Sequence, residues 1–299
     1  MIIVMLFVFG LIFGSFVNAL VWRLRQQELA SKKSKVHKVS KDVIAKLLST
    51  FHFQPSTKSD DLSIVHGRSM CPECRHELSA LDLIPVFSWL YLRGKCRYCH
   101  KPILIQYPLV ELLTAGLFVA SYIWWPSTVS SLLSTMQFAT WLLIIVGLVA
   151  LTVYDLRWML LPNRLIYPIS GLAVAFGLIN VSLADSPATA LINTALAVLV
   201  GGGIFYVIFQ VSNGKWIGGG DVRLGWMLGL LVATPAKAVL TIFLASVIGS
   251  LVSLPLLARG KLKIKASIPF GPFLITGAII TVLFGADILN WYTNTLIGY

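Results

Sequence analysis

This sequence has few charged residues. Asp, Glu, Lys and Arg together make up 12% of its 299 residues, about half of the share in a typical soluble domain. Apolar residues make up 57%, and the mean hydropathy is +0.82. The composition excludes an ordinary soluble globular protein and indicates an integral membrane protein.

Polar interruptions are also rare over long stretches of the chain. Apolar runs of roughly twenty residues, enough to cross a hydrocarbon core about 30 Å thick, recur at eight places. We therefore predict an all-α, polytopic membrane protein with about eight transmembrane helices. The predicted spans are residues 1–21, 104–125, 133–154, 164–182, 188–210, 221–233, 238–257 and 268–286, the sixth of which is short. The first lacks a charged leader and a cleavage site, so we expect it to be retained.

Acidic residues are scarce relative to basic ones, with 12 Asp and Glu against 24 Lys and Arg. Alternating crossings place every Lys and Arg except Lys237 on one side of the membrane. The positive-inside rule makes that side cytoplasmic and puts the N-terminus outside. Topology and anionic lipid explain the net charge of +12, so no nucleic-acid partner is expected. We predict a multi-pass membrane protein.

Cysteine is limited to four residues in two C-x-x-C pairs, Cys71/Cys74 and Cys96/Cys99, with 21 residues between the pairs. Two such pairs can complete a tetrahedral Zn²⁺ site. Disulfides are the alternative, but the predicted topology puts these thiols in the reducing cytoplasm. Four sulfur ligands leave no open position, so the predicted zinc is structural.

The domain boundaries follow from these features. We predict a first transmembrane helix at 1–21, a cytoplasmic basic loop and zinc domain at 22–103, and a seven-helix membrane domain at 104–299. The lysine- and serine-rich insert at 26–66 is expected to be mobile apart from one short amphipathic helix on the membrane surface. The apolar stretch 78–95, between the cysteine pairs, is expected to pack onto the membrane domain.

Two aspartates stand at the ends of apolar runs, and we predict that they are partners. Asp155 closes the third span, where the negative end of the helix dipole disfavours a carboxylate. Asp221 follows three glycines and precedes an apolar run, a position that also suits a simple N-cap. An acid at the edge of a membrane segment indicates a functional site. The glycines, Gly218, Gly219 and Gly220, would let an extended substrate backbone approach.

Other polar groups lie inside the predicted spans. Glu111 falls two turns into the second span, and a structural hydrogen bond and substrate recognition are both open for it. Asn18 ends the first span, where close helix packing or a functional role would account for it. Residues 201–203, three further glycines, are expected to serve helix packing or a flexible bend.

Together these residues resemble the bacterial prepilin peptidase family, also called type IV leader peptidases, which are membrane aspartic proteases of the Gly-x-Gly-Asp type. The motifs that carry the resemblance are residues 14–18, the two cysteine pairs, and residues 107–116, 155–163, 218–222 and 269–272. They cover nearly the whole chain except residues 26–66. One departure is Asn163, which stands where many relatives carry aspartate; we do not expect it to be catalytic.

The resemblance implies that Asp155 and Asp221 are the catalytic pair. It implies a multi-pass endopeptidase of the bacterial inner membrane that removes the short basic leader of type IV prepilins and type II secretion pseudopilins at the cytoplasmic face. It also implies N-methylation of the new N-terminus with S-adenosylmethionine. No nucleotide-binding strand and glycine loop is visible, so the sequence does not place the methyl donor.

A transporter that uses Asp155 and Asp221 as a proton or cation relay is the alternative function. A zinc-dependent scaffold without catalysis would explain the cysteines but not the paired acids. Both acids are predicted near one face, with none aligned across the bilayer, which favours the protease.

Overall fold

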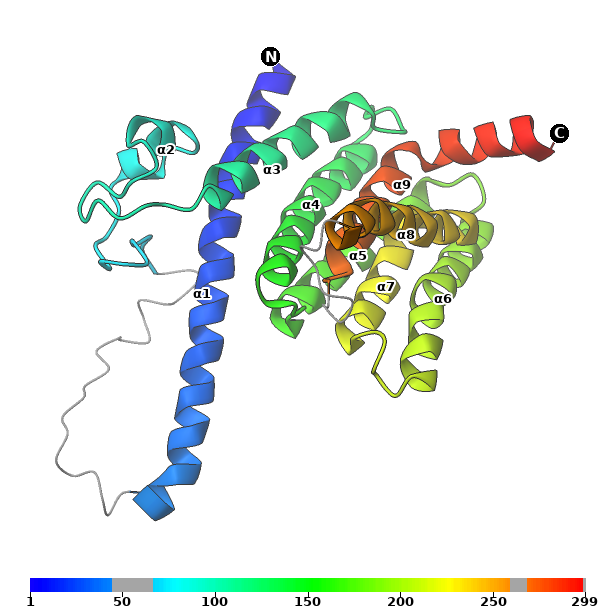
Figure 1. Cartoon of the computed structure of the whole chain (residues 1–299). Coiled ribbons are helices and arrows are strands. Elements are labelled where there is room, and N and C mark those ends of the chain that lie inside the picture. Colours follow the sequence, from blue (N-terminus) through cyan, green and yellow to red (C-terminus); the bar gives the residue numbers. More distant parts are fainter. Residues whose placement is uncertain (45–66, 259–267, 298–299) are drawn as a thin grey trace. The chain divides into compact units, whose positions relative to one another are not determined.

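The computed structural model describes residues 1–44, 67–258 and 268–297, and these are helical apart from loops (Figure 1). The pairing of extended backbone within them is limited to two isolated bridges, Met70–Glu77 and Lys95–Pro102. The elements in chain order are α1 (Ile2–Ile44), η2 (Ala80–Leu83), α2 (Phe87–Tyr91), α3 (Gln106–Ile123), α4 (Leu132–Trp158), α5 (Asn163–Leu183), α6 (Pro187–Val211), α7 (Gly219–Val232), α8 (Pro235–Ala258), α9 (Gly271–Tyr292) and η3 (Thr293–Ile297). The predicted all-α class is confirmed.

Six helices in the described part of the chain are long and apolar enough to cross a membrane, namely α1, α4, α5, α6, α8 and α9. The other two predicted spans correspond to α3, with 18 residues, and α7, with 14. A 14-residue helix is about 21 Å long, shorter than the hydrocarbon core.

The helix α1 does not end where the first span was predicted to end. It continues without a break to Ile44, so the first half of the insert is helical in continuation of the span, and no separate surface helix begins there. The remainder of the insert, residues 45–66, lies outside the described residues.

The described chain divides into two compact units, residues 8–115 and residues 1–7 with 116–299. In the first unit, α1 packs closely on the start of α3. A Cβ on Gly10 would lie 2.4 Å from the Cα of Ala115, and one on Gly14 would lie 2.6 Å from the Cα of Glu111. Glycine is required at both positions because the two backbones touch.

The second unit contains α4 to α9, coloured from green to red in Figure 1. Its core includes the fully buried side chains of Trp141, Ile144, Leu148 and Tyr154 from α4. This helix contributes many buried residues along its length, as expected for a helix surrounded by others.

Glycines bring α6 and α7 into backbone contact. A Cβ on Gly225 would lie 2.5 Å from the carbonyl oxygen of Gly201, and one on Gly202 would lie 2.2 Å from the ring of Trp226. The predicted packing role is therefore confirmed for Gly201 and Gly202. A Cβ on Gly203 would meet nothing within 4 Å. The close contact holds α7, the helix that carries Asp221, firmly in the unit.

Candidate functional site

The two aspartates lie in the same unit, Asp155 in the last turn of α4 and Asp221 in the first turn of α7. The chain reverses after Asp155 because Met159 ends α4 with a left-handed φ of 51° and donates its N–H to the Asp155 carbonyl at 2.7 Å. The helix therefore runs three residues past Asp155.

Asp221 is not the N-cap that local rules allow. Gly218 occupies that position and α7 begins at Gly219, so Asp221 is the third helical residue. A carboxylate there is favoured by the positive end of the helix dipole. The Asp221 carboxylate also accepts a hydrogen bond from the Gly218 backbone, which fixes the side chain against the glycine turn.

Asp155 is 95% buried, with 5% of its surface exposed. It accepts a hydrogen bond from the backbone of Gly271, the first residue of α9, and lies within electrostatic reach of Asp221. A Cβ on Gly271 would lie 2.5 Å from the Asp155 Oδ2 atom. The start of α9 thus forms one wall of the acid site, and any side chain at position 271 would displace the Asp155 carboxylate.

Leu161 connects the two acid-bearing segments. Its Cβ would lie 3.0 Å from a Cβ on Gly220, and its Cδ1 would lie 3.6 Å from one on Gly271. The glycine beside Asp221 and the glycine beside Asp155 therefore touch the same side chain. The structure brings together two acids that are 66 positions apart in the sequence.

A hydrogen bond also joins α7 to the start of α5. The guanidinium of Arg223 donates to the side-chain oxygen of Asn163, the first residue of α5. Both residues are exposed. Asn163, which departs from the family pattern, is therefore a polar partner of the helix that carries Asp221. Because Asn163 is an amide, the charge of Arg223 is not paired with a carboxylate at this contact.

The cysteines form a separate cluster. All four are free thiols, and their Sγ atoms lie within 4.8 Å of one another, with 3.9 Å between Cys71 and Cys99. Tetrahedral zinc with bonds of about 2.3 Å requires sulfur–sulfur distances of about 3.8 Å. The arrangement therefore fits a metal ion bound by four thiolates, and among the described residues the cluster contains no histidine.

The two cysteine turns have the same backbone geometry. Arg75 and His100 both follow the second cysteine of their pair, both have a positive φ (58° and 56°), and both donate their N–H to the carbonyl of the first cysteine. Each first cysteine in turn donates its own N–H across the turn, Cys71 to the carbonyl of His76 and Cys96 to the carbonyl of Lys101. Burial raises the pKa of Cys96, but backbone amides and neighbouring thiols outweigh burial and lower it to about 7.

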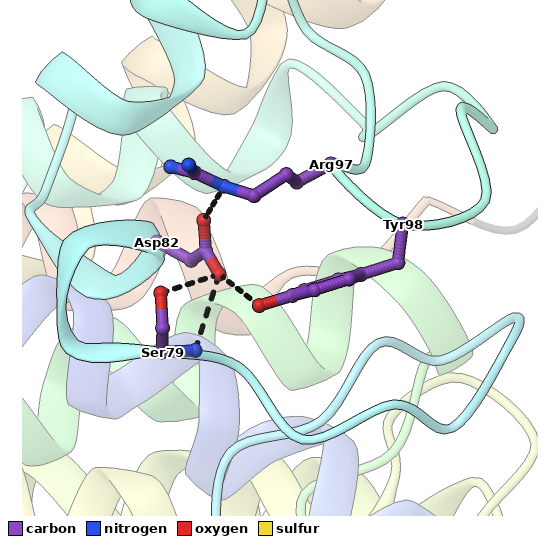
Figure 2. A network of polar contacts seen from close by, with 4 residues as sticks. All are labelled: Ser79, Asp82, Arg97 and Tyr98. Atoms are coloured by element: carbon purple, nitrogen blue, oxygen red, sulfur yellow. Dashed lines mark hydrogen bonds and ion pairs between the residues drawn. The ribbon is translucent and has the colours of Figure 1, made fainter.

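Asp82 ties the segment between the turns to the second turn (Figure 2). Its carboxylate accepts four hydrogen bonds, from the backbone N–H and hydroxyl of Ser79, from Arg97 Nε at 2.7 Å and from the Tyr98 hydroxyl at 3.1 Å. Burial raises the pKa of Asp82, but these hydrogen bonds outweigh it, and the pKa lies below its ordinary value. Sequence reasoning missed this residue because its donors come from two separate segments.

Glu111 and Asn18 lie in the unit of residues 8–115, apart from the acids' own unit. The Glu111 carboxylate accepts the backbone N–H of Val86 at 2.7 Å, and Asn18 donates to the carbonyl of Tyr107 at 3.1 Å. The Asn18 side-chain oxygen is buried and has no partner among the described residues. A structural hydrogen bond is therefore present for each residue, and the predicted substrate contacts remain predictions.

Comparison with known proteins gives a consistent family. The family described as the bacterial peptidase A24 N-terminal domain matches residues 8–125, and the type IV leader peptidase family matches residues 141–254. No solved structure matches this chain.

Curated relatives match over nearly the full length. A prepilin leader peptidase/N-methyltransferase of Aeromonas hydrophila is 33% identical over 98% of this chain and 94% of its own. The proteins of the same name from Pseudomonas aeruginosa and Bacillus subtilis are 31% and 33% identical, over 95% and 79% of this chain and 90% of their own lengths. The predicted resemblance is confirmed, and this chain belongs to the type IV leader peptidase family.

Proposed function

We propose that this protein is a membrane aspartic endopeptidase that removes the leader of type IV prepilins and pseudopilins and N-methylates the new N-terminus. The observation that carries the proposal is the placement of Asp155 within electrostatic reach of Asp221, in a chain of this family. The competing transporter has no support from the placement of the acids.

The mechanism follows from the chemistry of two adjacent carboxyl groups. Such a pair shares one proton, because two like charges at close range cannot easily both form. The ionised member removes a proton from water, which attacks the scissile carbonyl, and the protonated member donates to the carbonyl oxygen. The backbone N–H of Gly271 holds Asp155 in place for this reaction, and hydrolysis requires no metal and no covalent intermediate.

Several finer assignments belong to the same proposal. We assign eight crossings, with α3 and α7 completing the six long spans, the N-terminus outside and the cysteine domain in the cytoplasm. That topology puts the acids at the inner leaflet, where a prepilin with a membrane-embedded helix would present its cleavage site. The substrate backbone would approach closely at Gly218, Gly219 and Gly220. Glu111 and Asn18 are further candidates for substrate contact.

The cysteine cluster would hold a structural Zn²⁺. The thiolate set, its spacing and the twin turns support this metal, and its role would be to fold a domain too small for a core of its own. S-adenosylmethionine would supply the methyl group for N-methylation. No described residue is assigned to binding it.

Cleavage of a prepilin peptide, followed by mass spectrometry, tests the function. We expect the wild-type protein in detergent to release the leader, and Asp155→Asn and Asp221→Asn each to abolish cleavage while the protein stays folded. A variant of either kind that processes the peptide at close to the wild-type rate would remove the acid pair from the mechanism. The same reaction with an isotopically labelled methyl donor shows whether the new N-terminus gains a methyl group.

A further inference from the structure

An unusually apolar surface lies between the two cysteine turns. In the short helix α2 the side chains of Phe87, Leu90 and Tyr91 are 67%, 59% and 81% exposed, and Ile84 just before it is 44% exposed. A contiguous set of exposed apolar side chains of this kind marks contact with a partner or a membrane. A domain in water would not be expected to leave two aromatic rings and two aliphatic side chains uncovered within eight residues.

The contacts of Glu111 set the depth of this segment. Glu111 packs at Gly14 of α1, with the two backbones in contact, and hydrogen-bonds Ser15. Gly14 lies nine residues, or about 13 Å, before Arg23, the first charged residue of α1. The Val86 N–H reaches the Glu111 carboxylate at 2.7 Å.

The side chain of Glu111 tilts toward the N-terminus of α3 by less than one turn, as helix side chains do. That N-terminus lies at the Arg23 end of α1. Val86 therefore lies roughly 8 Å deeper than Arg23 along α1. The candidate membrane span of α1 runs from Ile2 to Ser31, so Val86 is level with that span and not beyond its end.

The backbone of the segment is prepared for such a position. In lipid every backbone polar group must find a partner within the protein. Ser88, Leu90 and Leu92 donate to carbonyls four residues back, and Gly94 donates to Trp89.

The N–H of Val86 differs, because its partner is the Glu111 carboxylate and not a carbonyl of its own segment. Phe87 donates to the Pro85 carbonyl at 2.6 Å across Val86, whose φ of 62° and ψ of −50° belong to the rare, strained γ-turn. Such strain persists only where surrounding contacts impose it. The carboxylate of Glu111 supplies that contact by accepting the N–H that the turn directs away from its own chain.

Two basic residues, Arg93 and Lys95, directly follow the segment. The next two basic residues, Arg97 and Lys101, form ion pairs with Asp82 and Glu73. Basic side chains directly after an apolar segment match anionic lipid headgroups, at about 1 kcal/mol for each charge near the surface. The combination of exposed aromatic rings and flanking cations is typical of an interfacial anchor.

We propose that Ile84–Tyr91 is a lipid-embedded anchor of the cysteine domain, in contact with acyl chains of the leaflet at the Arg23 end of α1, and that Glu111 is the latch that holds it at that depth. Phe87, Leu90 and Tyr91 face the acyl chains, and Arg93 and Lys95 contact anionic headgroups. The anchor does not depend on the acid pair, because Asp155 and Asp221 lie outside residues 8–115.

Site-specific photocrosslinking in vesicles tests the occupant. The full-length protein carrying a benzophenone amino acid at Phe87 or Tyr91 is reconstituted into phosphatidylethanolamine–phosphatidylglycerol vesicles, irradiated and digested for mass spectrometry. The matched control position is Glu77, an exposed residue on the first cysteine turn. We expect lipid adducts at 87 and 91 at least about fivefold above those at 77.

Two other results would overturn the anchor. Cross-links from 87 and 91 to residues 116–299 in place of lipid would show that the membrane helices cover this surface. Equal lipid yields at 77, 87 and 91, or none at any of them, would show that the segment has no preferred contact with the bilayer.

A pair of substitutions tests the latch. Glu111→Gln keeps a side-chain oxygen that can accept the Val86 N–H, whereas Glu111→Ala removes the acceptor. We expect Glu111→Ala to reduce lipid adducts at 87 about threefold or more and to speed amide exchange of Val86, with Glu111→Gln close to wild type in both. If the two variants behave alike in both measurements, Glu111 is not the latch.

Discussion

The wall that α9 places against Asp155 gives a sharp steric test of the acid site. In Gly271→Ala the new Cβ would lie 2.5 Å from the Asp155 Oδ2 atom, so the carboxylate must move by about 0.9 Å to reach an ordinary contact of 3.4 Å. The backbone N–H that Gly271 donates to Asp155 is retained in alanine. The substitution therefore changes the position of the carboxylate without removing a donor.

A displacement of this size has a large expected effect on catalysis. Misplacing a reacting group by about 1 Å can reduce the rate on the order of 100-fold, which corresponds to about 2.7 kcal/mol in activation free energy. We expect kcat for leader cleavage to fall about 100-fold in Gly271→Ala, with KM changed by less than about threefold, because the groups that bind the rest of the substrate are untouched.

The assay is cleavage of a prepilin peptide by the purified protein, with kcat and KM determined separately by mass spectrometry. The control is Gly203→Ala, because a Cβ there meets nothing within 4 Å and the variant should cleave within about twofold of wild type. Thermal unfolding of both variants checks that the fold is kept. If Gly271→Ala keeps more than about a third of the wild-type kcat, the geometry assigned to Asp155 is wrong.

Two further predictions concern the cysteine domain. Asp82→Asn should destabilise the segment between the cysteine turns by about 2 kcal/mol and speed its amide exchange about 30-fold, whereas Glu77→Gln, which breaks an exposed ion pair, should change exchange less than about threefold. The pKa of Asp82 is below its ordinary value of about 4. Its contribution to stability is therefore complete above pH 4 and is lost as the pH falls through the lower pKa of the folded state. Amide protection in the wild type should accordingly fall toward that of Asp82→Asn between pH 6 and pH 3. Replacing Cys71 and Cys96 together by serine should abolish metal binding, measured by elemental analysis, and shorten the lifetime of the protein in cells; one equivalent of tightly bound metal in that variant would contradict the four-cysteine site.

The sequence alone located the residues whose chemistry is carried by local pattern. The cysteine pairs have the spacing that two turns around one ion require, and the structure places their sulfur atoms within 4.8 Å of one another. Asp155 and Asp221 were found because each interrupts an apolar run at its end, and the structure places them in one unit.

Features that depend on contacts between distant segments were not accessible in this way. The wall formed by Gly271 and the link from Arg223 to Asn163 join residues that are more than 50 positions apart. Helix length was also misjudged: α1 continues to Ile44 because the lysine-rich sequence after the span contains no glycine or proline to end the helix.

The number of hydrogen bonds that each of these acids receives separates a reactive carboxylate from a structural one. An ionised carboxylate offers about four acceptor positions. Asp82 receives four donors, so its capacity is filled and its role is to hold the cysteine domain together. Glu111 accepts hydrogen bonds from the Val86 amide and from Ser15, so it joins the segment before α2 to α1, as the proposed latch requires.

Asp155 and Asp221 differ from both of these acids. Within the described residues each has one backbone donor, from Gly271 and Gly218 respectively, so most of the acceptor capacity of each carboxylate is left for water or substrate. Asp155 is buried, and burying an acid that the protein does not fully satisfy is costly; its proximity to Asp221 adds to that cost and brings no structural benefit. The incomplete hydrogen bonding of Asp155 and Asp221 is therefore itself an argument that these two acids, and not Asp82 or Glu111, carry out the proposed hydrolysis.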